Sequence, residues 1–205
     1  MNEFREILGK FLPLETSLSE GLFVSEKKEE KILKVGRKYL LGREPKESKE
    51  KAKIEKEFLS SNYSPIFLKT KDLKDLNNLS RKHLLFEFQM SGSEAYFKIE
   101  KILGRNKQVV VYYKGVKDLG GKRIKPLEPL LAQEGEKFEV VNLVVLLPAS
   151  KDKVLKIEFE SPQTGSGEKY FLAAGFSLSK NDMSIFDRGL EKIKDEELPS
   201  FPFPK

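Results

Sequence analysis

The 205-residue chain contains no cysteine and no tryptophan, and its only histidine is His83. Without cysteine it forms no disulfide framework, no thiolate metal site and no cysteine nucleophile. A single histidine also argues against histidine-rich metal sites and against Ser-His-Asp catalysis. The glycines at 165–167 match neither the spacing nor the context of a phosphate-binding loop. The sequence therefore predicts a protein that is not an enzyme and that holds no cofactor or metal.

Long apolar runs are missing as well. No stretch approaches the ~20 residues that a membrane-spanning helix requires. Charged side chains interrupt the apolar residues of segment 1–12, which is not typical of a secretory signal. We therefore expect a cytoplasmic protein without a membrane span.

The excess of positive charge lies in the middle of the chain. The whole sequence has a net charge of +6, whereas residues 81–125 alone hold 11 basic and 4 acidic side chains, a difference of +7. Two interpretations stay open. The lysines solvate the edges of strands, or a folded sheet gathers them into a surface that attracts phosphate groups.

From about residue 63 the sequence consists of short runs rich in Val, Ile, Phe and Tyr, most of them separated by Gly, Asn, Ser, Pro and Lys. Leu84, Phe86 and Phe88 recur at every second position, as do Phe97 and Ile99, which is typical of half-buried antiparallel strands. Regularly spaced runs of this kind predict a small barrel or sandwich. We expect an α+β, mainly β fold: a small antiparallel β-barrel with a C-terminal helix and an N-terminal helical extension.

The N-terminal part has a different texture. Residues 44–60 are almost all Lys and Glu and predict a solvent-exposed helix or linker. Residues 22–43 fit either a helix or a pair of strands, because Gly36 and Gly42 interrupt both patterns. Residues 2–12 carry an apolar stripe at helical spacing, for which we expect burial: Phe4, Ile7, Leu8, Phe11 and Leu12. We accordingly divide the chain into a charged, helical extension over 1–62 and a barrel domain over 63–205.

A capped helix is predicted near the C-terminus. Ser179 and Asp182 resemble a capping box at its start, and Pro199 marks its end. An apolar stripe follows the cap and is expected to pack on the barrel: Ile185, Phe186, Leu190 and Ile193.

Residues 78–195 resemble a PilZ domain, a small β-barrel family whose members often bind the bacterial second messenger cyclic di-GMP. The resemblance is clearest where 143-LVVLLP-148, 153-KVLKIEFE-160 and the stretch 170–193 follow one another. It is carried by apolar positions and glycines over a little more than half of the chain. It implies a bacterial signalling protein with a barrel fold.

The ligand motifs of that family are incomplete in this chain. In 80-SRKHLLFEF-88, Arg81 stands for the first arginine of the Arg-x-x-x-Arg motif, but Leu85 occupies the place of the second. In 99-IEKILG-104, Gly104 is retained, whereas Ile99 replaces the acid and Lys101 replaces the serine. Lysine does not reproduce the bidentate grip of a guanidinium. We therefore expect weak or absent binding of cyclic di-GMP, at a phosphate patch formed by Arg81, Lys82, Lys101, Gly104 and Arg105.

Two functions of different classes follow. The leading one is a non-enzymatic signalling or adaptor module that acts through a protein partner. The alternative is a basic β-barrel that binds nucleic acid, with bases stacking on Tyr96, Phe97, Tyr112 and Tyr113 if these share a face. We expect His83 to be a partly exposed strand residue without a special role.

Overall fold

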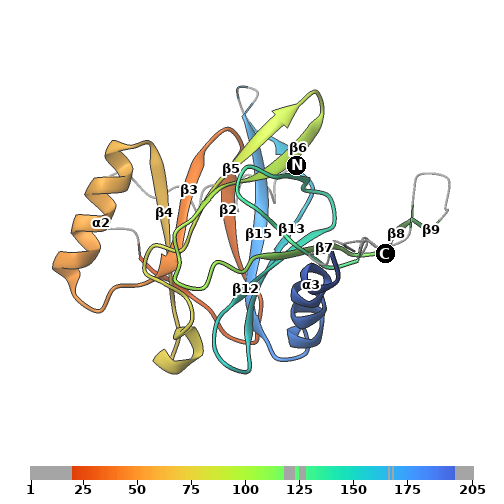
Figure 1. The fold of residues 1–205 in the computed structure, drawn as a ribbon. Coiled ribbons are helices and arrows are strands. Elements are labelled where there is room, and N and C mark those ends of the chain that lie inside the picture. The colour runs from red at the N-terminus through yellow and green to blue at the C-terminus, as the bar shows by residue number, and fades with distance from the viewer. Residues whose placement is uncertain (1–19, 118–122, 125–127, 166, 168, 197–205) are drawn as a thin grey trace, which may run out of the picture.

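The computed structural model describes residues 20–117, 123–124, 128–165, 167 and 169–196 (Figure 1). The fold is mainly β, with a helix on each side of the strands. Within the described residues, six strands form a mixed sheet, sheet A, in the order β1-β4-β3-β5-β6-β11. Its strands are β1 (Leu22–Phe23), β4 (Tyr63–Lys69), β3 (Lys38–Arg43), β5 (Leu84–Ser91), β6 (Glu94–Ile102) and β11 (Lys137–Glu139).

A second, antiparallel sheet, sheet B, has the order β10-β7-β12-β13-β15-β14, and β2 also pairs with β15. Its strands are β10 (Leu130–Leu131), β7 (Val110–Tyr113), β12 (Leu143–Pro148), β13 (Val154–Phe159), β15 (Tyr170–Ser179), β14 (Gln163–Thr164) and β2 (Glu29–Lys34). A short separate ladder joins β8 (Val116–Lys117) to β9 (Arg123–Ile124).

The inner faces of the two sheets form the main core. The alternation predicted for β5 and β6 is observed, since Phe86, Phe88 and Phe97 are each at most 1% exposed. Phe159 of β13 meets them from the other sheet, with ring centroids 5.3 Å from Phe88 and 5.6 Å from Phe97. Each such ring buries a large apolar area. The contact between the sheets therefore dominates the stability of the fold.

Helix α2 (Ser48–Ser60) covers the outer face of sheet A and connects β3 to β4, which lie side by side in parallel. Its Ile54 and Phe58 are one turn apart and pack against Leu40, Phe67 and Leu85 of the sheet. A parallel pair needs a crossover connection, and α2 supplies it. The predicted helix in the Lys- and Glu-rich segment is thus present, with one face docked on the sheet.

Helix α3 (Met183–Glu196) covers the outer face of sheet B, on the opposite side of the molecule from α2 (Figure 1). One half of the predicted capping box is observed, since the Asp182 amide donates to Ser179 Oγ at 3.2 Å. The Asp182 carboxylate pairs with Lys156 instead. Phe186 is buried, and Ile185 and Leu190 are partly buried in the same cluster, as expected. The side chain of Ile193 lies outside the described residues.

Several expectations need correction. The two sheets are not closed into a barrel, and β4 pairs in parallel with β1 and β3. The described part of 1–62 is helical only in α2. Its strands β2 and β3 pair with β15 and β5 from the later part of the chain. Gly36 interrupted the pattern of apolar residues because it lies in the turn between β2 and β3, where it takes a positive φ of 81°. The apolar stripe of residues 2–12 lies outside the described residues.

Neither helix in the described ranges has the length and apolar character needed to cross a membrane.

The docking of α3 gives a first prediction. Phe186→Ala removes a ring that is 4% exposed, so we expect a loss of about 3 kcal/mol in the free energy of unfolding, measured by urea denaturation. The exposed neighbour Asp187 supplies the matched control, Asp187→Ala, which should change stability by less than about 0.5 kcal/mol. Equal stability of the two variants would contradict the packing of this helix.

Candidate anion-binding site

The structure brings most of the predicted patch together at one end of sheet A. Residues 80–83 precede β5 and residues 103–105 follow β6, and these two strands form a hairpin. The amides of Leu103 and Gly104 donate to the His83 carbonyl at 2.7 and 3.1 Å, and the Arg105 amide donates to Ser80 Oγ at 3.2 Å. Arg81, Lys82, Gly104 and Arg105 therefore lie on two adjoining loops. Lys101 is paired with Leu85 across the hairpin.

His83 holds these loops together, and our expectation for it was wrong. Its side chain is 0% exposed. Ring atom Nδ1 accepts a hydrogen bond from the Ser80 amide at 3.1 Å, whereas Nε2 has no partner among the described residues. Gly104 lies so close that a Cβ there would be 2.4 Å from Nδ1. Gly104 is thus required by the packing of a buried imidazole.

Burial lowers the pKa of His83 to about 4. Protonation of Nδ1 would turn this acceptor into a donor facing the Ser80 amide, and it would place a charge in a buried position, so the imidazolium form is disfavoured. At neutral pH the ring is therefore uncharged, and it adds no positive charge to the candidate site.

The 80–83 loop is also fixed to the end of β3. The Arg43 amide donates to the Ser80 carbonyl and the His83 amide donates to the Leu41 carbonyl, both at 3.0 Å. Between them Gly42 approaches the loop backbone, where an added Cβ would lie 1.9 Å from the Arg81 carbonyl oxygen. The backbone of the predicted patch is therefore held rigidly by its neighbours.

Helix α2 neutralises the two cations of this loop. Arg81 forms an ion pair with Glu50, and Lys82 Nζ lies 2.7 Å from a Glu57 carboxylate oxygen. The Lys82 ammonium also lies 5.1 Å from the centre of the Phe58 ring. Both acids belong to α2, and Glu57 is exposed whereas Glu50 is partly exposed, so each pair remains open to solvent and contributes at most about 1 kcal/mol to stability. The carboxylates of Glu50 and Glu57 nevertheless occupy the positions beside Arg81 and Lys82 that a bound phosphate would take.

Two of the positions that align with the family's ligand motifs hold buried apolar side chains. Leu85 packs under α2 and Ile99 is buried between the two sheets. Lys101 and Arg105 are exposed, and neither has an ion pair within the described part of the chain. Of the cations in the predicted patch, Lys101 and Arg105 are thus the two without a counter-charge among the described residues. The second arginine, the acid and the serine of the family motifs, which would hydrogen-bond a ligand beside them, are all replaced.

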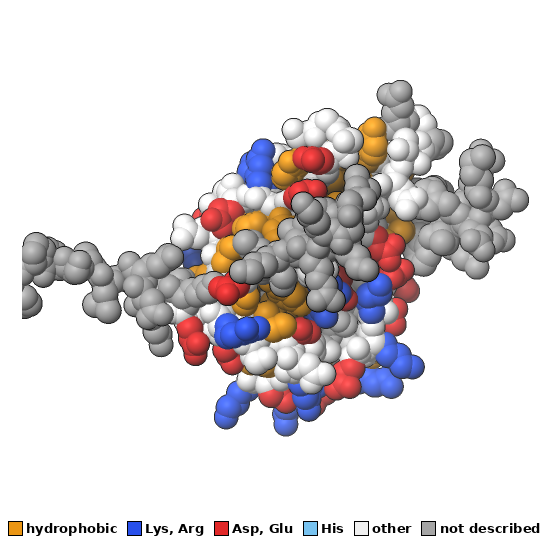
Figure 2. Space-filling model, turned by 90° about the vertical axis from the view of Figure 1, so that its right-hand side faces the viewer, with side chains coloured by type: hydrophobic (Ala, Val, Ile, Leu, Met, Phe, Trp, Pro, Cys, Tyr) orange, Lys and Arg blue, Asp and Glu red, His pale blue; other side chains and the backbone are white. Residues whose placement is uncertain are grey.

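The basic middle segment does not form a uniform surface. Lys98 pairs with Glu87 at 3.3 Å, and Lys114 pairs with Glu158. Figure 2 shows Lys and Arg side chains interspersed with Asp and Glu on the face turned to the viewer. The pairs of Lys98 and Lys114 favour the interpretation that the described lysines of this segment mainly solvate the sheets.

The four aromatic residues proposed for base stacking do not share a face. Phe97 points into the core, whereas its neighbour Tyr96 lies outside and donates to Glu94 at 2.6 Å. Tyr112 packs in the cluster beneath α3, and burial together with Asp182 raises its pKa to about 12. The acidic neighbours of these hydroxyl groups do not favour contact with a nucleic-acid backbone.

In the part of the chain that the structure describes, no group of three or more His, Cys, Asp or Glu side chains lies close enough together to hold a metal ion.

Comparison with protein-family models, curated proteins and solved structures finds no match. The resemblance to PilZ domains therefore rests on the sequence pattern alone.

The buried histidine predicts a specific pH dependence. Because the folded-state pKa of about 4 lies below the ordinary value of 6.5, His83 contributes stability that is complete above pH 6.5 and is lost as the pH falls towards 4. The loss amounts to about 3 kcal/mol at most. In His83→Asn, whose side-chain oxygen can still accept from the Ser80 amide, this part of the slope should disappear, as measured by denaturation at several pH values.

Proton NMR offers a direct check. The chain has a single histidine, so its imidazole resonances can be followed without assignment. A titration midpoint near the ordinary histidine value would contradict the buried, neutral ring.

Proposed function

We propose that this chain is a non-enzymatic, cytoplasmic adaptor module of bacterial signalling, related to PilZ domains, that acts through a protein partner with weak or no binding of cyclic di-GMP. The observation that carries the proposal is the position of α2. This helix covers Leu85 and pairs with both Arg81 and Lys82. The surface that the family uses for its ligand is thereby occupied by the chain itself.

The order of elements supports the relation to the family. The segments that carry the resemblance coincide with β12, β13, β15 and α3, which follow one another along the chain. The first three are adjacent in sheet B, and α3 packs across its outer face. A barrel-like ancestor whose sheets have opened would keep these features, and we propose this relation for the fold.

The energetics favour weak nucleotide binding. A hydrogen bond to a charged group contributes about 1.5–3 kcal/mol, and the second arginine, the acid and the serine of the motifs are all replaced. Any incoming phosphate must also displace Glu50 and Glu57. Losing two or three such hydrogen bonds lowers affinity by on the order of a thousandfold or more.

The nucleic-acid alternative has less support. It rests on the net charge of the middle segment, whose lysines are partly paired, and on aromatic rings that point in different directions. An oligonucleotide arm in the experiment below tests it directly.

The test is titration calorimetry of the wild-type protein and of the double variant Glu50→Gln/Glu57→Gln with cyclic di-GMP and with a mixed oligonucleotide. We expect no binding, or weak and salt-sensitive binding, in the wild type. Freeing Arg81 and Lys82 should strengthen binding of cyclic di-GMP severalfold at low salt, because the internal carboxylates no longer compete. Loss of two exposed ion pairs should change stability little.

The control is Glu26→Gln/Glu29→Gln, which makes the same change of net charge at two exposed positions that pair with neither cation. It should leave the affinity for cyclic di-GMP unchanged. Micromolar binding by the wild type that persists in high salt would overturn the proposed ligand behaviour, and tight oligonucleotide binding would favour the alternative function.

A further inference from the structure

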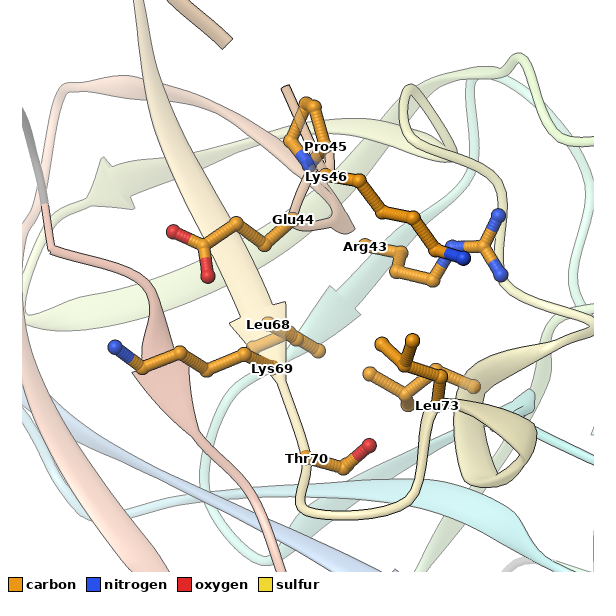
Figure 3. A pocket seen from close by; sticks show the side chains of 9 residues that line it. Arg43, Glu44, Pro45, Lys46, Leu68, Lys69, Thr70 and Leu73 are labelled. Carbon is orange, nitrogen blue, oxygen red and sulfur yellow. The ribbon is translucent and has the colours of Figure 1, made fainter. Parts of the chain in front are cut away.

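A hollow of about 180 Å³ lies at the carboxyl ends of the parallel strands β3 and β4 (Figure 3). Its walls come from the loop after β3, the end of β4 and the short 3-10 helix η1 (Leu73–Leu76). In sheets with parallel strands, ligands often bind just beyond the carboxyl ends of those strands. The volume exceeds the roughly 150 Å³ of an engineered cavity that binds benzene.

Two cations face this hollow without a counter-charge. Arg43 and Lys46 both line it, and neither forms an ion pair with any residue that the structure describes. The one acidic side chain in the lining, Glu44, is engaged by Lys51 at 2.6 Å. Figure 3 shows Glu44 and Lys69 extending to one side of β4, whereas Arg43 and Lys46 extend together to the other. The positive charge at this end of the hollow is therefore not cancelled.

The floor of the hollow is apolar. Leu68 and Leu76 belong to the main core and are at most 1% exposed, and Pro45 is buried beside them. Leu73 is 49% exposed although it is a large aliphatic side chain. An exposed leucine alone needs no explanation. Here it lies within a concave surface next to two unpaired cations, which is the composition of a binding site for an amphipathic anion.

We propose that this hollow, defined by Arg43, Lys46, Leu68 and Leu73, binds a small water-soluble phosphate monoester whose organic part is apolar. The guanidinium of Arg43 holds the phosphate through two parallel hydrogen bonds, and the Lys46 ammonium adds a second charge. Two cations match a phosphate dianion better than a carboxylate, which brings a single charge. The organic group rests on Leu73, whose side chain is exposed within the hollow.

This site is distinct from the phosphate patch discussed above. The side chains of Arg81 and Lys82 are taken by α2, and neither residue lines the hollow. The inference is therefore independent of the proposed adaptor function, and either can fail while the other stands.

The test uses phenyl phosphate as the probe, with benzoate, phenol and inorganic phosphate as comparisons, and records amide NMR spectra of the full chain. We expect saturable shifts at residues 43–46 and 68–76 with phenyl phosphate. Benzoate and inorganic phosphate should each bind about tenfold more weakly, because each lacks one part of the ligand, and phenol should not bind measurably.

Arg43→Gln and Lys46→Gln should each weaken binding of phenyl phosphate by about tenfold, and Leu73→Ser should weaken it severalfold. Neither side chain forms a hydrogen bond or an ion pair with a residue that the structure describes, so the variants should fold normally. The matched control is Lys74→Gln, which removes a nearby exposed cation that does not line the hollow.

Three results would overturn the proposal. They are equal losses of affinity in Lys74→Gln and Arg43→Gln, shifts spread over the surface without saturation, and inorganic phosphate binding as tightly as phenyl phosphate. The first two would indicate non-specific attraction by net charge, and the third would show that the apolar floor takes no part.

Discussion

Burial of the inner faces of the two sheets against each other is the constraint from which the rest of the structure follows. Once Phe86, Phe88 and Phe97 point inward to meet Phe159, every intervening residue of β5 and β6 must point outward. The outer face then carries Leu85 and, from β3 and β4, Leu40 and Phe67. These apolar side chains need a cover, and α2 supplies it. The position of α2 in turn brings its acids to the loop before β5.

The candidate site illustrates which parts of a structure a sequence encodes locally. The alternation of β5 and β6 was predicted, and a hairpin necessarily places the residues before its first strand next to those after its second. The meeting of Arg81 with Gly104 and Arg105 follows from that rule. The cap at Ser179 and the apolar stripe of α3 were predictable for the same reason, since their signals lie within one or two helical turns.

Other features depend on contacts between distant segments, and no local pattern reveals them. His83 is buried because the loop at 80–83, the loop at 103–105 and strand β3 converge on it. Its immediate neighbours in sequence, Lys82 and Leu84, give no sign of this. Gly42 interrupts the apolar pattern of β3 because the backbone of Arg81 lies against it. The charged helix α2 gave a clear local signal of helix, but its partners Arg81 and Lys82 come from beyond β4. The sheets remain unclosed for a similar reason, since barrel closure depends on strand stagger rather than on alternation.

The pairing of β2 with β15 has a consequence for how the chain is made. Six residues of β2, beginning at Glu29, form their ladder with residues 171–176, near the opposite end of the sequence. During synthesis β2 must therefore wait, unpaired, until residues 171–176 have left the ribosome. Contacts of such large sequence separation slow folding, and a waiting strand edge invites association with other chains. The charged residues of β2, Glu29, Glu30, Lys31 and Lys34, are suited to protect it during that interval.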